Sequence, residues 1–249
     1  MIATIQYNSR KLQIDLSKPL DISIPMHASS SNVNAWYVGP PKIEPVKDGD
    51  WVAAVKDGAC INFNNIVFNP HAHTTHTECV GHITEDVHSI NKNLKAFFFL
   101  AEVITVAPEK FGKDFVISKK QIQFALGNKK RDAVVIRTIP NTNEKLSKQY
   151  SNTNWPYLQD DAVALLVKKG IKHVLVDIPS IDRERDNCEL KGHNIFWNTN
   201  GQLRLDATIT ELIYVPNNVD DGTYFLNLQI ASFENDATPS KPILYKVIR

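Results

Sequence analysis

Short apolar runs separated by turn-forming residues recur along the chain, and they predict a protein rich in β-strands. Phe97–Val106 and Ala133–Thr138 are apolar, contain many β-branched or aromatic residues and end near Pro108 and Pro140, as buried strands often do. By the same criteria we expect further strands at Leu12–Leu16, Ile22–Ile24, Ile61–Phe68, His173–Ile178, Ile209–Val215 and Tyr224–Ala231.

One segment has the length and composition of a buried helix. Asp160–Lys169 contains the unbroken apolar run Ala162–Val167, is rich in Ala and Leu, and is followed by Gly170, which is typical of a helix end. The next segment is the expected strand at His173–Ile178, so the order is helix, turn, strand. The sequence therefore predicts a mixed α/β or α+β chain in which strands outnumber helices.

No linker divides the chain, and we expect one domain over residues 1–249. Residues 28–50 are rich in Ser, Asn, Pro and Gly and predict a long loop, in which Trp36 and Tyr37 could cover a pocket. Cys60, Cys79 and Cys188 are too few and too widely spaced for a disulfide framework, which favours free thiols.

Charge and hydropathy exclude some classes of partner. Lys plus Arg is 28 and Asp plus Glu is 27, which gives a net charge of +1, so the chain lacks the basic excess of a nucleic-acid-binding protein. The beginning of the chain does not resemble a signal peptide, and no apolar stretch reaches the roughly 20 residues of a membrane span. We expect a soluble, cytoplasmic protein with no membrane or nucleic-acid partner.

The most informative pattern is a cluster of histidines, because four of the eight lie at 71, 73, 76 and 82. In an extended segment His71 and His73 would share a face, and so would His76 and Glu78. His82 follows Glu78 by four positions, about one helical turn. A strand followed by a turn can therefore direct several imidazoles and one carboxylate to the same point.

Imidazole and carboxylate are the usual ligands of catalytic zinc, and a set of this kind without cysteine also suits manganese or iron. Glu78 has two oxygens and could bridge two metal ions. The other interpretations are histidines that only form hydrogen bonds in a polar loop, and a loop that binds metal without catalysis. Four histidines with an interleaved glutamate favour a catalytic metal site.

The same residues resemble the metal-dependent cyclase family, which includes bacterial kynurenine formamidases and isatin hydrolases. Its motif is H-x-G-T-H-x-D-x-P-x-H, and His76, Glu78 and His82 stand at the positions of the second histidine, the acid and the last histidine. Thr74 replaces the glycine and Val80 replaces the proline, which suggests a divergent member.

The first histidine of the motif falls on Ala72, so either His71 or His73 has to supply that ligand. A branch of the family has the pattern H-G-N-G-T-H-T-E, in which the first histidine matches His71. We therefore favour His71 over His73.

The resemblance extends from about residue 12 to the C-terminus. Val176–Asp182 looks like the D-x-P-S-x-D segment of the family, and His193 and Glu211 stand where it supplies two further ligands, with Asn198–Asp206 as a candidate local insertion. The resemblance implies a single-domain, β-rich "swivelling" β/β/α fold. We expect Asp177 and Asp182 to cap the turns that follow them, with support of a metal-binding histidine as the alternative.

The resemblance also implies a site and a reaction. In the family, the residues matching His71, His76 and Glu78 hold one metal, and those matching Glu78, His193 and Glu211 hold a second. We expect one or two divalent ions per chain, with zinc favoured over manganese, and His82 as general base and then general acid.

The reaction would open an amide, lactam or ester bond of a small, possibly aromatic substrate, in a homodimer or homotetramer. Four aromatic residues could line the substrate pocket or belong to the ordinary core: Trp36, Trp51, Phe63 and Phe68.

Two competing functions remain. The pair His71-x-His73 resembles the H-x-H that begins the sites of other binuclear hydrolases, such as metallo-β-lactamases, although Thr75 occupies the place of their aspartate. A non-catalytic metal-binding protein that retains the fold is the other alternative.

Overall fold

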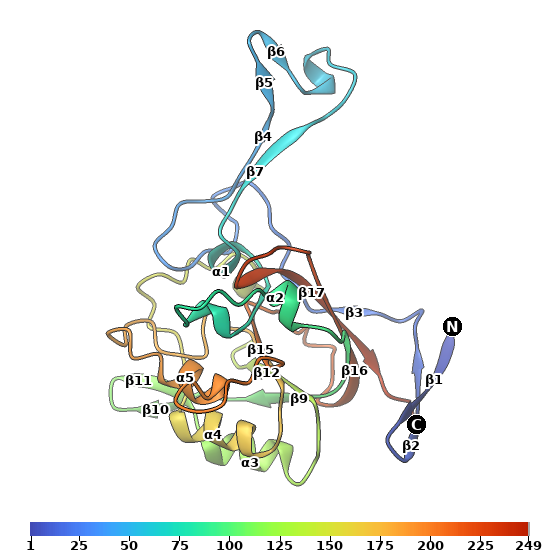
Figure 1. The fold of residues 1–249 in the computed structure, drawn as a ribbon, viewed down its shortest axis with the longest axis vertical. Helices are drawn as coiled ribbons and strands as arrows, with labels where there is room; N and C mark the ends of the chain where they lie inside the picture. The colour runs from blue at the N-terminus through green and yellow to red at the C-terminus, as the bar shows by residue number, and fades with distance from the viewer. Residues whose placement is uncertain (249) are drawn as a thin grey trace.

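A closed β-sheet forms the centre of the protein in the computed structural model, which describes residues 1–248 (Figure 1). Its strands follow the order β16-β9-β12-β14-β15-β8-β17, and β17 pairs again with β16, so the sheet closes on itself. The strands are β8 (His76–Glu78), β9 (Phe98–Val106), β12 (Ala133–Thr138), β14 (His173–Val176), β15 (Thr208–Glu211), β16 (Gly222–Ile230) and β17 (Ala237–Lys246). The short β3 (Leu20–Asp21) extends the sheet beyond β17.

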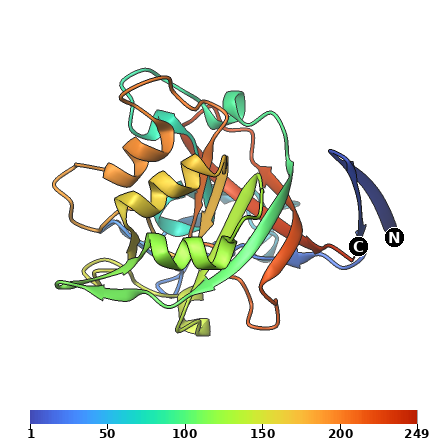
Figure 2. The same cartoon turned by 90° about the horizontal axis from the view of Figure 1, so that it is seen from below.

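Four neighbouring strands, β9, β12, β14 and β15, are parallel, and helices cover them on one face. Figure 2 shows α3 (Lys119–Leu126), α4 (Asp160–Lys168) and α5 (Lys191–Trp197) lying together against the outside of the sheet. The helix expected at Asp160–Lys169 and the strand after it are thus confirmed as α4 and β14. The mixed, β-rich α/β fold is confirmed as well.

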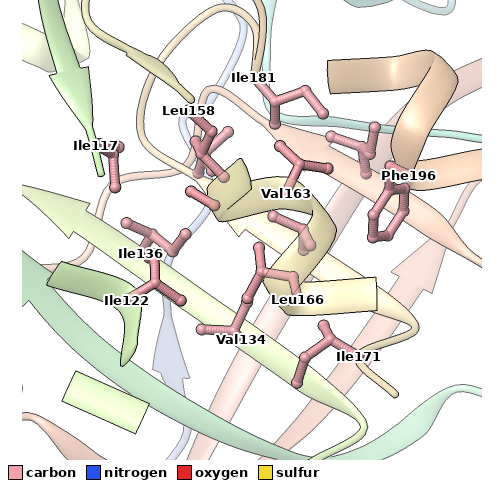
Figure 3. Packing of buried hydrophobic residues seen from close by; sticks show 14 of the residues in the cluster. Ile117, Ile122, Val134, Ile136, Leu158, Val163, Leu166, Ile171, Ile181 and Phe196 are labelled. Carbon is pink, nitrogen blue, oxygen red and sulfur yellow. The ribbon is translucent and has the colours of Figure 1, made fainter. Parts of the chain in front are cut away.

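Side chains of the parallel strands alternate between two cores, as the two-residue period of a strand requires. Val134 and Ile136 point outward and pack with Val163 and Leu166 of α4, as Figure 3 shows. Neighbouring residues such as Val135 instead join a second apolar cluster on the opposite face, which the closed sheet surrounds. Burial on both faces explains why these strands have continuous apolar sequences.

A β-hairpin arm, residues 42–67, projects from the body of the protein (Figure 1). It contains β4 (Lys42–Pro45), β5 (Lys47–Asp48), β6 (Trp51–Val52), the 3₁₀ turn η1 (Val55–Asp57) and β7 (Asn64–Val67). The expected loop at 28–50 is therefore wrong in its second half, because β4 pairs with β7 and β5 with β6. Trp51 and Phe63, which we considered for a substrate pocket, are about half exposed on this arm.

The remaining elements are short. β1 (Ile2–Tyr7) and β2 (Arg10–Asp15) form a hairpin, and β10 (Glu109–Phe111), β11 (Asp114–Ile117) and β13 (Tyr157–Leu158) form a small sheet. Single turns occur at α1 (Pro70–His73), η2 (Val80–His82), α2 (Ile90–Asn93) and η3 (Asn143–Leu146). Within residues 1–248, no helix has the length and apolar character that crossing a membrane requires.

Candidate metal centre

The centre is built on β8, the short strand between β15 and β17. His76 and Glu78 are two positions apart on this strand, so they share a face, as the sequence predicts. Glu211, at the end of β15, pairs directly with His76 across the two strands, and paired residues of neighbouring strands project to the same side. The sheet register alone therefore brings His76, Glu78 and Glu211 together on its outer face.

His71 reaches the same point from α1. Asn69 caps this turn by accepting the backbone N–H of His71 at 2.9 Å, and Pro70 occupies the first helical position, which proline favours. Nδ1 of His71 lies 3.2 Å from Oε2 of Glu78. The imidazole also packs edge-on against His76, with ring centroids 4.9 Å apart.

His73 lies outside the cluster. We expected an extended segment in which His71 and His73 share a face, and this is wrong because the segment is helical. Residues two apart on a helix point in nearly opposite directions. Nε2 of His73 is 2.8 Å from the carbonyl of Gly39, and its Nδ1 accepts the N–H of Asn69 at 2.9 Å. The structure thus selects His71 as the histidine that faces Glu78.

His82 and His193 approach the two oxygens of Glu78 from different elements, and their ring centroids are 5.7 Å apart. His82 ends the turn η2, and its Nε2 lies 3.8 Å from Oε2 of Glu78, with about a third of the side chain exposed. His193 is buried on α5, and its Nε2 lies 3.2 Å from Oε1 of Glu78. The side chain of His193 therefore lies inside the protein and not on its surface.

Asp182 contacts both the beginning of α5 and the imidazole of His193. It accepts the backbone N–H groups of Gly192 at 2.7 Å and His193 at 3.0 Å, and so caps the beginning of α5. Its Oδ2 also lies 2.6 Å from Nδ1 of His193. A carboxylate behind an imidazole fixes which ring nitrogen carries the hydrogen and leaves the other free to bind metal.

Asp236 is a member of the cluster that sequence reasoning missed. Its Oδ2 lies 2.9 Å from Nε2 of His71 and 3.1 Å from Nδ1 of His82. Asp236 stands in the polar run Glu234-Asn235-Asp236, which resembles an ordinary turn. Only the pairing of β17 with β8, which the sequence does not reveal, brings it to the histidines.

Three groups of residues offer ligand atoms within 4.8 Å of one another in the described part of the chain. They are His71/His76/Glu78, Glu78/His82/His193 and His71/His82/Asp236. The first matches the set expected for one metal. Glu211, expected with Glu78 and His193 in a second set, stands beside His76 instead, with Oε2 at 3.5 Å from Nε2 of His76 and Oε1 accepting the N–H of Ile181 at 2.9 Å.

Two buried atoms at the middle of this cluster have no hydrogen-bond partner, namely Nε2 of His76 and Oε2 of Glu78. Buried polar atoms are nearly always paired, because leaving one unpaired costs about 1–3 kcal/mol. Both atoms are ligand types that zinc and manganese accept. The residues present therefore fit a divalent metal ion, which would supply the partner that both atoms lack.

The titratable groups of the cluster have strongly shifted pKa values. Burial lowers the pKa of His76 to about 3, and the charge on His71 contributes in the same direction. Burial raises the pKa of Glu211 to about 8, and the charge of Glu78 adds to this effect. Burial opposes the charge on His71 most strongly, but the neighbouring carboxylates of Asp236 and Glu78 outweigh it and raise the pKa of His71 to about 10.

Glu78 behaves as the central anion. Its burial works to raise the pKa, yet the surrounding imidazoles of His82, His193 and His71 hold the pKa well below the ordinary value. Metal ligands must have free lone pairs, so a metal ion held by His71 and Glu211 would have to displace the protons that these two groups carry at neutral pH.

Other residues that the sequence analysis named contact residues outside the cluster. Trp36 packs edge-on against Trp155 at 4.9 Å, and Phe68 lies 6.4 Å from Phe233. Asp177 is buried and forms an ion pair with Lys145 at 2.7 Å.

Comparison with known proteins agrees with this geometry. A family model described as "Putative cyclase" matches residues 14–183. A "potential metal-dependent hydrolase with cyclase activity" superimposes with a TM-score of 0.66 at 17% identity, over 92% of this chain and 97% of that one. A "predicted metal-dependent hydrolase from Bacillus stearothermophilus" gives 0.63 at 18% identity, over 92% and 98%.

Isatin hydrolase A from Labrenzia aggregata gives a TM-score of 0.66 at 13% identity, over 92% of this chain and 93% of that one. No curated protein sequence matches this chain. At these identities the solved structures show a shared fold. The family model covers well over half of the sequence, and this chain belongs to the cyclase family.

Proposed function

We propose that this protein is a metal-dependent hydrolase that opens an amide, lactam or ester bond of a small substrate. The observation that carries the proposal is the pair of buried, unpartnered atoms, Nε2 of His76 and Oε2 of Glu78, at the meeting point of the histidines and carboxylates. A purely structural polar cluster would pair such atoms with each other.

His71, His76 and Glu78 are the proposed ligands of one ion, and His193 and Glu211 are the proposed additional ligands of a second. Glu78 can serve both, because its two oxygens face different imidazoles: Oε2 faces His71 and Oε1 faces His193. Zinc is the favoured metal, with manganese as the alternative. Such an ion supplies Lewis acidity, which activates water and polarises a carbonyl group.

His82 is the proposed proton-transfer residue. About a third of its side chain is exposed, which is more than for His71 or His193, so it lies at the accessible side of the cluster. Its Nδ1 faces Asp236 and its Nε2 faces Glu78. In this orientation Nε2 can take a proton from the attacking water and return it to the leaving nitrogen or oxygen, as general base and then general acid.

The substrate class is proposed from the fold neighbours, which include isatin hydrolases, named for a fused aromatic lactam. Formanilides, fused lactams and aryl esters are therefore the compounds to test first. A binuclear hydrolase of the H-x-H type is not favoured, because His71 and His73 point away from each other.

Two measurements test the proposal. Elemental analysis of the purified protein, after reconstitution with zinc or manganese, should find about one or two ions per chain. His82→Ala should retain the metal and lose at least about a hundredfold in turnover, within the usual contribution of general acid–base catalysis. His27→Ala, which removes an exposed loop histidine, is the matched control and should behave as wild type.

Absence of metal after reconstitution would contradict the site. Metal binding without hydrolysis of any compound in the panel would favour the non-catalytic alternative. Loss of metal from His82→Ala would make His82 a ligand.

A further inference from the structure

One carboxylate oxygen, Oδ2 of Asp236, contacts two imidazoles of the centre at the same time. It lies 2.9 Å from Nε2 of His71 and 3.1 Å from Nδ1 of His82. The two rings stack on each other, with centroids 4.3 Å apart and planes inclined by 28°. The proposed metal ligand and the proposed proton-transfer residue therefore share one hydrogen-bond acceptor.

The opposite edges of the same two rings face Glu78. Nδ1 of His71 is 3.2 Å from Oε2 of Glu78, and Nε2 of His82 is 3.8 Å from the same oxygen. The stacked pair thus lies between two carboxylates, with Asp236 at one end and Glu78 at the other. Oε2 of Glu78 is one of the two buried atoms that lack a hydrogen-bond partner, so this end of the pair is the metal side.

This arrangement determines where the ring hydrogens lie. A carboxylate only accepts hydrogen bonds, so Nε2 of His71 and Nδ1 of His82 must each carry a hydrogen to bond to Asp236. In a neutral ring the free lone pair is then on Nδ1 of His71 and on Nε2 of His82, both on the side of Glu78. The first is available to a metal ion and the second can accept a proton from substrate water.

The pairing of β17 with β8, the strand that carries His76 and Glu78, also fixes the position of Asp236. Its carbonyl accepts the N–H of Cys79 at 3.0 Å, immediately after β8, and the next residue, Ala237, pairs with Glu78. Asp236 is therefore fixed beside the strand that carries the ligands, and is not part of a freely moving turn. Asp182 stands in the corresponding position behind His193.

We propose that Asp236 is a positioning residue that holds His71 and His82 stacked, each with its free nitrogen directed at the metal side. This inference rests on the proposed function, and it adds a coupling between metal binding and proton transfer that the ligand set alone does not contain. Removing Asp236 would disturb both histidines at once.

The test compares Asp236→Ala and Asp236→Asn with wild type, in zinc-loaded protein labelled with ¹⁵N-histidine. In wild type, long-range ¹H–¹⁵N spectra should show His71 with its hydrogen on Nε2 and His82 with its hydrogen on Nδ1. In Asp236→Ala these assignments should become mixed, and zinc affinity, measured by competition with a chelator, should fall about 10- to 100-fold. Turnover, where present, should fall in kcat more than in KM.

Asp236→Asn should be intermediate, because its neutral amide oxygen can still accept from both rings but forms weaker hydrogen bonds than a carboxylate oxygen. This variant also keeps the side-chain volume, so it addresses the case in which Asp236→Ala does not fold. The matched control is Glu234→Ala, an exposed acidic residue two positions earlier that contacts Lys92 and Asn91 and no residue of the centre.

Unchanged ring assignments and unchanged zinc affinity in both Asp236 variants would overturn the inference. This outcome is separable from failure of the proposed function. A wild-type protein that binds zinc but hydrolyses nothing contradicts the hydrolase, and the ring assignments and zinc affinity then decide the role of Asp236 by themselves.

Discussion

Glu78 is the residue on which the centre depends. Its side chain is completely buried, and each of its oxygens faces a different imidazole, His193 for Oε1 and His71 for Oε2. Burying a carboxylate is costly unless opposite charges compensate for it. The imidazoles provide part of this compensation, and the unpartnered state of Oε2 indicates where a metal cation would provide the rest.

The first prediction at this scale separates the two histidines of α1. His71→Ala should reduce zinc affinity at least about tenfold, because it removes a proposed ligand that faces Glu78. His73→Ala should retain zinc but lose about 1–3 kcal/mol of stability, because two buried hydrogen bonds disappear. Zinc titration against a chelator and urea unfolding measure the two effects. Equal loss of zinc in both variants would contradict the assignment.

At the scale of elements, short pieces of secondary structure place the ligands, and long ones supply the frame. β8 has only three residues, but it pairs with β15 on one side and β17 on the other. On α5, the orientation of His193 depends on Asp182, which caps the beginning of the helix and contacts the imidazole. Changes at these junctions should therefore affect the metal more than changes in the outer helices.

Gly192 provides the test at this scale. A Cβ atom at this position would lie 2.7 Å from Oδ1 of Asp182, which is closer than real side chains approach, so the carboxylate would have to move. Gly192→Ala should therefore loosen His193 and weaken zinc binding about tenfold. Gly39→Ala is the control, since a Cβ there meets no atom within 4 Å. Zinc competition measures both, and equal affinities in the two variants would contradict this role of Asp182.

The sequence predicts individual buried strands and helices better than it predicts which strands pair with one another. Continuous apolar runs identified β12 and α4 almost to the residue, because strands and helices buried in a core need such runs. β17 escaped notice because Pro239 and Pro242 interrupt its pattern, and proline normally argues against a strand inside a sheet.

Asp236 was not assigned to the site because it immediately precedes β17, which the sequence analysis did not identify as a strand. The other candidate residues of the site were named from the sequence by motif and resemblance, and the structure brings them together. The roles of these residues as ligands or as a base stay predictions. The sequence already favoured His71 over His73 through the resemblance, and the structure adds the reason why only His71 faces Glu78, which is one turn of helix that the strand-like pattern does not suggest.

At the scale of the whole molecule, the centre joins segments that are far apart in the chain. Its residues come from α1, β8, η2, α5 and β15, and from Asp236, which immediately precedes β17. A metal ion bound at this centre should stabilise the folded state and not the unfolded one. The homodimer or homotetramer also stays a prediction at this scale, and the exposed apolar residues of the arm make it the first surface to examine.

Metal removal should consequently lower thermal stability. At a zinc concentration about 100 times Kd, the gain is about 2.7 kcal/mol, which for a chain of this size corresponds to a Tm shift of about 5–10 °C. Scanning calorimetry with zinc or with EDTA measures this shift. Glu78→Gln should abolish the zinc-dependent part, and a shift of the same size in that variant would indicate that zinc binds elsewhere.

Acid should destabilise the protein through a histidine outside the centre. His173 is buried against Phe99 and bonded to Thr208 at 2.9 Å, and burial lowers its pKa from 6.5 to about 3. Between these values the unfolded chain binds a proton that the folded chain does not, so the stabilising contribution is complete above pH 6.5 and is lost as the pH falls. This histidine should account for about 2 kcal/mol of the loss between pH 7 and pH 5.

His173→Gln should remove this part of the pH dependence. Urea unfolding at pH 7 and pH 5 provides the measurement in both proteins. The difference between the two pH values should be about 2 kcal/mol smaller in the variant. An identical difference in both proteins would show that other groups account for the acid sensitivity.

The place of β8 between β15 and β17 also has a consequence in time. During synthesis the histidine run leaves the ribosome early, but Glu211 and Asp236 follow more than a hundred residues later. β8 can complete its pairing only when Ala237–Lys246 has emerged. A nascent chain therefore exposes its histidines long before it can hold them in place, and the full cluster can assemble only when the last strand has closed the sheet.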